Sequence, residues 1–423
     1  MPKIIVAHPH QQHSYQLAIA MYKIDYLFQY VTTVYFKYRS LTYLCTKLLK
    51  SNDKIKAETR YCKLIPDEKV KQICEIEGLC YLLLMRLTHN NKHILNKYNH
   101  FVSVKFGSKL AKYAVSNNVD AVICYDGEST TLFRQLKQKN PKIIRVLDVS
   151  AANKLFLRQI YEDDMIRLPE FSSRLKNERC DIFDENVSLE NAKLEIEDAN
   201  YFLVPSHFVS ESLRSYGVSE NQILYCPYGV DLKLFQEKKY LINAGKPLKV
   251  IYVGGVKQLK GIGYLLKAFQ IINPNIAKLT IVGNYDKSSE DIKPYIQNIT
   301  FTGMVLHKEI PLLLQESDIF IFPSLGDSFG LAALEAGACG LPLILSENTG
   351  MKDYISDGVE GFIIPVGSIE SIVEKIIWFN NNREMIEIMG RNARNMAKKM
   401  TWDNYYINVE NNIKKILENN HHE

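Results

Sequence analysis

Long apolar runs and closely spaced cysteines are missing from this 423-residue chain, and we expect no secretory leader. No stretch approaches the roughly 18 consecutive apolar residues that would span a bilayer, and the opening MPKIIVAHPH is typical of a strand followed by a polar loop. The eight cysteines lie far apart and show neither the spacing of a zinc site nor that of a disulfide framework. We therefore expect a cytoplasmic protein with reduced, mostly buried cysteines.

Two common nucleotide-binding signatures are missing as well. The sequence has no G-x-x-x-x-G-K-[ST] phosphate loop and no G-x-G-x-x-G dinucleotide fingerprint, which argues against a P-loop ATPase and against a dehydrogenase. It also lacks a zinc finger, a base-stacking motif and a long basic stripe. We expect no nucleic-acid partner.

The net charge of +5 is small but unevenly distributed, because residues 1–60 hold nine Lys or Arg against three Asp or Glu. Within residues 37–56, apolar side chains recur at helical spacing among lysines, which predicts a basic amphipathic helix: Leu41, Leu44, Cys45, Leu48 and Leu49. Two interpretations stay open. In the first, the apolar stripe faces the protein core, as is commoner in soluble proteins. In the second, it rests on the inner face of an anionic membrane.

Short β-branched runs alternate with helical segments through both halves of the chain. They read IIVA (4–7), AVIC (121–124), IIRVL (143–147), FLVP (202–205), KVIYVGG (249–255), LTIVG (279–283), ITFTG (299–303), IFIFPS (319–324) and LPLIL (341–345). This alternation predicts an α/β fold with two Rossmann-like domains, residues 1–230 and 231–401, that face a central cleft. We expect the last helix, 402–423, to return to the first domain, and ligands to bind where the strands end.

The segment 252–269, YVGGVKQLKGIGYLLKAF, is typical of a strand, a glycine turn and a helix. Gly254 and Gly255 would let a phosphate approach the backbone, and the helix start offers unpaired N–H groups. Lys260 adds a positive charge ahead of that helix, so we interpret it as a ligand of a diphosphate. A tight turn with a solvated lysine is the alternative.

The segment 319–345, IFIFPSLGDSFGLAALEAGACGLPLIL, predicts a strand, a loop and a helix that stops at Gly340 and Pro342. Glu335 is the only charged residue of this Ala-, Gly- and Leu-rich helix, so a buried carboxylate there needs a partner. Asp327 precedes the helix, where Asp is most often a cap. Its eight-residue separation from Glu335 spans at most about 12 Å of helix rise, comparable to the reach from sugar to ribose across a diphosphate.

The helix start itself is a second candidate phosphate site. The backbone N–H groups of Phe329, Gly330 and Leu331 can face a phosphate, and the helix dipole favours its charge.

Taken together, these segments make the carboxyl-terminal half resemble the retaining glycosyltransferases of family four, which have the glycosyltransferase B fold. The resemblance rests on YVGG and LKG in 252–261 and on PSLGDSFGLAALEAGACGLP, TGMKDYI and DGVEGFIIP in 323–365. LVPSHFVSESLRSYGV and YCPYGVD in 203–231 resemble the interdomain region of the family. The match covers roughly residues 195–400, and the combination is far more specific than any single motif.

The resemblance implies a reaction and a set of site residues. A sugar would pass from a nucleotide-diphosphate donor to the hydroxyl of a saccharide or lipid-linked acceptor, with retention, without metal or cofactor, in cell-surface polysaccharide or glycoconjugate synthesis. Asp327 and Lys260 would be catalytic, and Glu335 would hold the ribose. The remaining donor contacts would come from Gly254, Gly255, Gly283, Ser328, Phe329, Gly330 and Leu331.

Three positions depart from the family pattern. Asp327 stands where the family usually has Glu, Gly255 where Arg is frequent, and Asp148 where a strand normally ends in His. The amino-terminal half matches more weakly, with HPHQQHS (8–14) in place of a glycine-rich loop, and it offers His13 and Asp148 as candidate acceptor or sugar contacts. An inactive nucleotide-sugar-binding protein and a sugar-nucleotide epimerase therefore remain alternatives.

Overall fold

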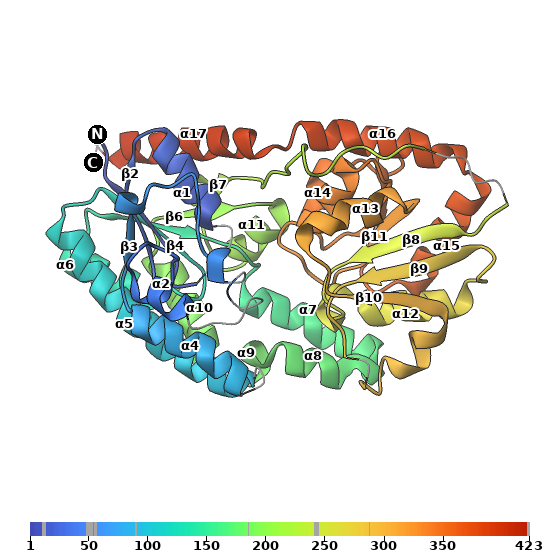
Figure 1. Cartoon of the computed structure of the whole chain (residues 1–423), viewed down its shortest axis with the longest axis horizontal. Helices are drawn as coiled ribbons and strands as arrows, with labels where there is room; N and C mark the ends of the chain where they lie inside the picture. Colours follow the sequence, from blue (N-terminus) through green and yellow to red (C-terminus); the bar gives the residue numbers. More distant parts are fainter. Residues whose placement is uncertain are drawn as a thin grey trace.

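The computed structural model describes residues 1–10, 14–47, 54, 57–88, 91–184, 186–240, 245–286 and 288–420. Its two parallel β-sheets lie side by side, each with helices on both faces (Figure 1). The first sheet has seven strands in the order β3-β2-β1-β4-β5-β6-β7. They are β1 Ile4–Ala7, β2 Leu27–Thr32, β3 Val70–Gln72, β4 Ala121–Tyr125, β5 Ile144–Asp148, β6 Tyr201–Val204 and β7 Ile223–Tyr225.

The second sheet has six strands in the order β10-β9-β8-β11-β12-β13. They are β8 Leu248–Val253, β9 Ala277–Val282, β10 Ile299–Gly303, β11 Ile319–Phe322, β12 Leu343–Ser346 and β13 Gly361–Ile364. Strands β4, β5, β11 and β12 are buried along their whole length. This burial explains why they read as continuous apolar runs, because helices cover parallel sheets on both sides.

Helices connect the strands in both domains. Those of the first domain are α1 Ser14–Lys23, α2 Leu41–Thr46, α4 Glu75–Leu87, α5 Lys92–Ser116, α6 Thr130–Lys139, α7 Lys154–Arg167, α8 Ser172–Glu178, α9 Cys180–Phe183, α10 Asn186–Asp198 and α11 His207–Arg214. Those that follow are α12 Ile262–Ile271, α13 Ile310–Gln315, α14 Leu331–Ala338, α15 Ile369–Asn381, α16 Glu384–Lys398 and α17 Trp402–Asn420.

The chain crosses between the domains at two adjacent points. Val230 N–H donates to Met400 C=O at 2.9 Å, and a Cβ on Gly229 would lie 2.2 Å from the backbone nitrogen of Trp402. After the second crossing, α17 lies along α1 in the first domain (Figure 1). An ion pair of 2.9 Å between Lys23 and Asp403 joins the two helices. The carboxyl-terminal helix thus ties the two domains together.

The α/β fold with two Rossmann-like domains is confirmed, and every strand expected from the sequence is present. Strands β2, β3, β7 and β13 are additional. The domain boundary at residue 230 stays a prediction, with β7 ending at Tyr225 and β8 beginning at Leu248. Six of the eight cysteines are buried, and all are free.

The helix expected over residues 37–56 is shorter in the structure, as far as its residues are described. Residues 37–40 precede α2, whose helical span is Leu41–Thr46, and residues 48–53 and 55–56 lie outside the described residues. Leu41 and Leu44 are exposed, so at these positions the interpretation as a core-facing stripe was wrong. The buried side chains of α2 are Thr42 and Thr46, because Thr42 donates from its amide and its hydroxyl to Glu75 of α4.

Candidate nucleotide-sugar site

The candidate site lies where the strand order of the second sheet reverses. Strands β9 and β10 follow on one side of β8, and β11, β12 and β13 on the other. Loops at the carboxyl ends of such neighbouring strands form the crevice in which open α/β sheets bind ligands. The loops after β8 and β11 carry most of the site residues expected from the sequence.

A glycine holds these two loops together. Gly261 has φ +72°, and a Cβ there would lie 1.8 Å from the carbonyl oxygen of Pro323. The Leu325 amide donates to Leu259 C=O at 3.1 Å across the same junction. Lys260 lies between these contacts and forms an ion pair with Asp327. Its ammonium also lies 5.6 Å from the centre of the Phe322 ring.

Three glycines lie at the carboxyl ends of β8 and β9. A Cβ on Gly283 would lie 1.9 Å from the carbonyl oxygen of Gly254, so the ends of β8 and β9 meet without space for a side chain. At Gly255 the neighbour is different, because a Cβ would lie 3.4 Å from Cε of Lys257. The stem of Lys257 therefore runs beside Gly255, the position where the resemblance led us to expect Arg.

The start of α14 is held by Asp327 and by the first domain. Gly330 is the residue before the helix, with φ +92°, and Asp327 Oδ1 accepts the Phe329 amide at 3.0 Å. One of the three amides expected to face a phosphate is therefore bonded within the chain. Ser328 C=O accepts the hydroxyl of Ser206, the residue that caps α11 of the first domain, at 2.6 Å. Leu331 is exposed.

Glu335 has the partner that its position in an apolar helix requires. His307 Nε2 lies 2.8 Å from Glu335 Oε1. Only 16% of the Glu335 side chain is exposed, against 63% of His307. The carboxylate raises the pKa of His307, mainly through this hydrogen bond. No sequence pattern indicated His307 as the partner of Glu335, because His307 lies 28 residues away in a different loop.

Helices α7 and α8 of the first domain reach across to the second (Figure 1). The carboxylate of Glu178 accepts the backbone amides of Gln258 at 3.0 Å and Leu259 at 3.1 Å, in the turn that carries Lys260. Asp164 accepts the Tyr264 hydroxyl at 2.6 Å and the Gln258 side chain at 2.9 Å. Burial raises the pKa of Asp164 and of Glu178. The lysine loop is thus braced from the first domain.

A second brace is the ion pair between Arg174 of α8 and Asp291, with nitrogen to oxygen distances of 2.5 and 2.8 Å. The same guanidinium donates to Val256 C=O at 3.1 Å. The sequence did not indicate these interdomain contacts.

No described contact joins the two candidate acceptor residues, His13 and Asp148, to Lys260. His13 lies outside the described residues. Asp148 is the last residue of β5 and is 3% exposed. Its charge raises the pKa of the buried Tyr228 and Tyr405, after the larger effect of burial. Both roles stay predictions.

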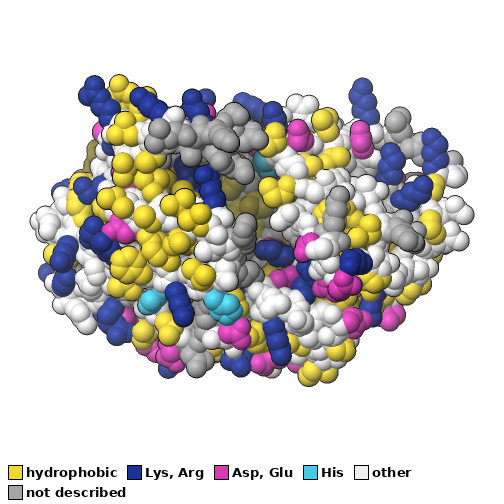
Figure 2. Space-filling view, turned by 60° about the horizontal axis from the view of Figure 1, so that its bottom comes forward, with side chains coloured by type: hydrophobic (Ala, Val, Ile, Leu, Met, Phe, Trp, Pro, Cys, Tyr) yellow, Lys and Arg dark blue, Asp and Glu magenta, His cyan; other side chains and the backbone are white. Residues whose placement is uncertain are grey.

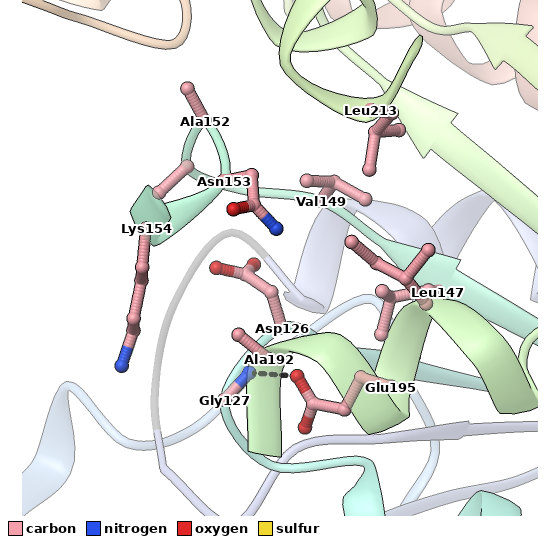
Figure 3. Close-up of a pocket in the computed structure, with 12 residues that line it drawn as sticks. Asp126, Gly127, Leu147, Val149, Ala152, Asn153, Lys154, Ala192, Glu195 and Leu213 are labelled. Atoms are coloured by element: carbon pink, nitrogen blue, oxygen red, sulfur yellow. Dashed lines mark hydrogen bonds between the residues drawn. The ribbon is translucent and has the colours of Figure 1, made fainter. Parts of the chain in front are cut away.

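A small cavity lies in the first domain, at the ends of β4 and β5 (Figure 3). Its volume of about 30 Å³ admits a water molecule rather than a sugar ring. Glu195 on its wall accepts the amides of Gly127 at 2.8 Å, Ser129 at 2.6 Å and Thr130 at 3.0 Å, which caps the start of α6. Burial raises the pKa of Glu195 to about 7.

Glu128 in the following turn has a higher pKa, of about 8, chiefly because of burial. It accepts hydrogen bonds from Asn99, at 3.0 Å, and from Ser103. Within the described part of the chain, no group of three or more His, Cys, Asp or Glu side chains is arranged to hold a metal ion.

Comparison with known proteins identifies the class of this architecture. Residues 235–396 match the family model described as "Glycosyl transferases group 1". Sulfoquinovosyl transferase SQD2 of Arabidopsis thaliana is 30% identical over 218 residues, 48% of this chain and 42% of that protein. Capsular polysaccharide biosynthesis glycosyltransferase CapM of Staphylococcus aureus is 30% identical over 208 residues, 44% of this chain and 54% of CapM. The chain spans about half the length of the curated relatives that it matches.

Among solved structures, Anabaena HepE in complex with UDP and glucose aligns with a TM-score of 0.62 at 13% identity, over 98% of this chain and 100% of HepE. A likeness at this identity concerns the fold alone. The two facing Rossmann-like domains define a protein with the glycosyltransferase B fold. Its second domain, over residues 235–396, is similar to the group 1 glycosyltransferases.

Proposed function

We propose that this protein transfers a sugar from a nucleotide-diphosphate sugar to an acceptor hydroxyl, with retention of anomeric configuration. The observation that carries the proposal is the pairing of Lys260 with Asp327 at the start of α14, in the crevice where the strand order reverses. This arrangement provides a cation, helix amides and a carboxylate within one loop pair, as a diphosphate and its sugar require.

In the proposed donor complex, Lys260 leaves Asp327 to bind the diphosphate, and Asp327 turns to the transferred sugar. Lys257, whose stem lies beside Gly255, supplies the second cation. Glu335 accepts the ribose hydroxyls, with His307 holding the carboxylate in place. The UDP in the HepE complex supports a nucleotide donor for a chain of this fold.

The proposed chemistry needs no protein nucleophile. The acceptor hydroxyl attacks from the face that the diphosphate leaves, and a leaving phosphate oxygen takes its proton. The cations and the amides at the start of α14 stabilise the developing negative charge. Because they supply that stabilisation, we propose that the reaction is metal-independent and requires no cofactor.

We place the acceptor, a saccharide or a lipid-linked saccharide, on the first domain and assign the reaction to cell-surface polysaccharide or glycoconjugate synthesis. The role stated in the name of CapM supports this assignment. A cytoplasmic protein that contacts the membrane through residues 37–56 also remains our proposal. Among the described residues, no helix is long and apolar enough to cross a bilayer.

The test is release of nucleoside diphosphate from a panel of UDP-, GDP- and ADP-sugars with and without saccharide acceptors. Acceptor-dependent release that Lys260→Ala and Glu335→Ala both abolish supports the proposal. Lys278→Ala and Glu374→Ala serve as controls, because these exposed residues lie at the start of β9 and on α15, away from the crevice. Donor binding without release by any acceptor would favour an inactive binding protein, and conversion of the donor without acceptor an epimerase.

A further inference from the structure

Helix α4 is the most conspicuous exposed apolar element outside the candidate site. Nine of its thirteen residues are apolar, in the sequence EIEGLCYLLLMRL, yet only Gly78 is buried. A helix that is apolar on all sides is ordinarily buried in a core or in a membrane. Gly78 explains how α4 is attached, because a Cβ there would lie 2.5 Å from Thr33 Oγ1. The helix therefore packs closely through its glycine and presents leucines outward.

The apolar surface continues onto the neighbouring helices α2 and α5, which both contact α4. We call it the α4 face and define it by its exposed apolar side chains: Leu41, Leu44, Ile76, Leu83, Leu87, Ile94, Phe101 and Val104. Figure 2 shows hydrophobic side chains gathered over the half of the molecule formed by the first domain, with lysines and arginines among them. Isolated exposed apolar residues are normal, but a contiguous patch of this kind marks an interaction site.

Positive charges outnumber negative ones around the α4 face. Residues 75–116 hold six Lys or Arg and only two carboxylates, Glu75 and Glu77. Both carboxylates are engaged within the protein, Glu75 by Thr42 and Glu77 by Lys105. Lys97 of α5 is an exposed cation on this side of the first domain. An apolar ridge among cations complements an anionic lipid surface, whereas a second copy of this chain would bring like charges together.

The α4 face borders the acceptor side of the first domain. The ring of Tyr81 on α4 lies 4.8 Å from the ring of His10, just beyond the end of β1, and Asn99 of α5 bonds the same imidazole at 2.5 Å. A bilayer on this face would therefore lie next to the carboxyl ends of the first sheet.

We propose that the α4 face docks this protein on the surface of an anionic phospholipid bilayer, with the leucines of α4 among the lipid chains and the cations at the lipid phosphates. The docking proposal is argued from the exposed apolar and basic side chains of the α4 face and does not depend on the proposed function. Only its consequence, delivery of a lipid-linked acceptor to the cleft, rests on the proposed glycosyltransferase function.

The experiment is co-sedimentation of the full chain with phosphatidylcholine vesicles that contain or lack phosphatidylglycerol, at low and high salt. We expect binding to the anionic vesicles at low salt and weaker binding at high salt, since salt screens the lipid charge. The double variant Leu83→Glu/Leu87→Glu should bind at least about tenfold more weakly, because two exposed leucines no longer enter the bilayer. Lys97→Gln should weaken binding about fivefold.

Leu312→Glu is the matched control, because Leu312 is 63% exposed on α13 of the second domain, away from the α4 face. It should bind like the wild type, and all variants should unfold at the same temperature. Absence of wild-type binding to anionic vesicles at low salt would overturn the proposal, as would equal binding by the double variant. A lipid-free dimer that the double variant dissociates would instead identify a second copy as the occupant. Sugar transfer to a soluble acceptor, measured in parallel, shows separately whether the proposed function holds.

Discussion

Replacing Gly261 by alanine tests how the site is assembled. Gly261 has φ +72°, and a non-glycine residue in this left-handed region loses about 1–2 kcal/mol. The new Cβ would also lie 1.8 Å from the carbonyl oxygen of Pro323, a backbone atom that cannot rotate away. Relieving that overlap requires the two loops to separate by about 1.2 Å, and overpacking of this kind costs about 1–3 kcal/mol more. We expect Gly261→Ala to lower the free energy of unfolding by about 2–5 kcal/mol in total.

Gly358→Ala separates the two contributions. Gly358 has φ +81°, but no described atom lies within 4 Å of the Cβ position, so only the backbone penalty of about 1–2 kcal/mol applies. Urea unfolding followed by circular dichroism measures both variants, and calorimetry measures nucleoside diphosphate binding. Gly261→Ala should weaken nucleotide binding, because it moves the loop that carries Lys260 away from the start of α14, where the diphosphate is proposed to bind, and Gly358→Ala should not. Equal stabilities of the two variants, or wild-type nucleotide binding by Gly261→Ala, would refute this reasoning.

Three further substitutions test the electrostatics of the protein. Asp327→Asn should strengthen donor binding by freeing Lys260, yet reduce turnover at least about a hundredfold, as calorimetry and steady-state kinetics would show. Glu128→Gln should flatten the pH dependence of stability. In the wild type, burial raises the pKa of the Glu128 carboxyl to about 8. This shift contributes on the order of 4–5 kcal/mol to the free energy of unfolding below pH 4.5, and the contribution is lost as the pH rises to about 8. Glu178→Ala should lower stability by about 1–3 kcal/mol and weaken donor binding, because two backbone amides lose their acceptor, and Glu178→Gln should restore part of both.

Each of these expectations has a contrary outcome. Weaker donor binding by Asp327→Asn would mean that the carboxylate, and not only the lysine, holds the donor in the ground state. A wild-type stability curve that runs parallel to that of Glu128→Gln between pH 5 and 8 would contradict the raised pKa of this carboxyl. For Glu178, the matched control is Glu162→Ala, an exposed carboxylate paired with Arg158 on α7. If Glu178→Ala and Glu162→Ala had equal effects on stability and donor binding, Glu178 would not be a brace of the loop that carries Lys260.

The sequence predicted the second sheet and the loops that follow β8 and β11 because their signals are local. Apolar runs mark the buried strands, and Gly254, Gly261 and Gly330 mark the turns that follow them. The ion pair between Lys260 and Asp327 joins two loops 67 residues apart. Each partner was identified in its own motif, but their direct contact was not expected.

Other features depend on contacts that no local pattern reports. His307 meets Glu335 only when α13 and α14 pack together, and Glu178 meets the lysine loop only when the two domains associate. The α4 face was missed for a different reason. Its helix is apolar all round, so it lacks the one-sided periodicity that distinguishes a surface helix, and its exposure follows from close packing at Gly78. The 37–56 segment showed that periodicity, but its leucines at 41 and 44 face outward.

Calorimetric titration with UDP, GDP and ADP tests the central claim most directly, because it measures the donor site without requiring the acceptor. The account predicts that the wild type binds at least one of these nucleotides. Lys260→Ala should weaken that binding about tenfold or more, since a charged hydrogen bond to phosphate contributes about 1.5–3 kcal/mol, and Lys278→Ala should leave it unchanged. Failure of the wild type to bind any nucleoside diphosphate, or equal affinities of the wild type and Lys260→Ala, would contradict the account.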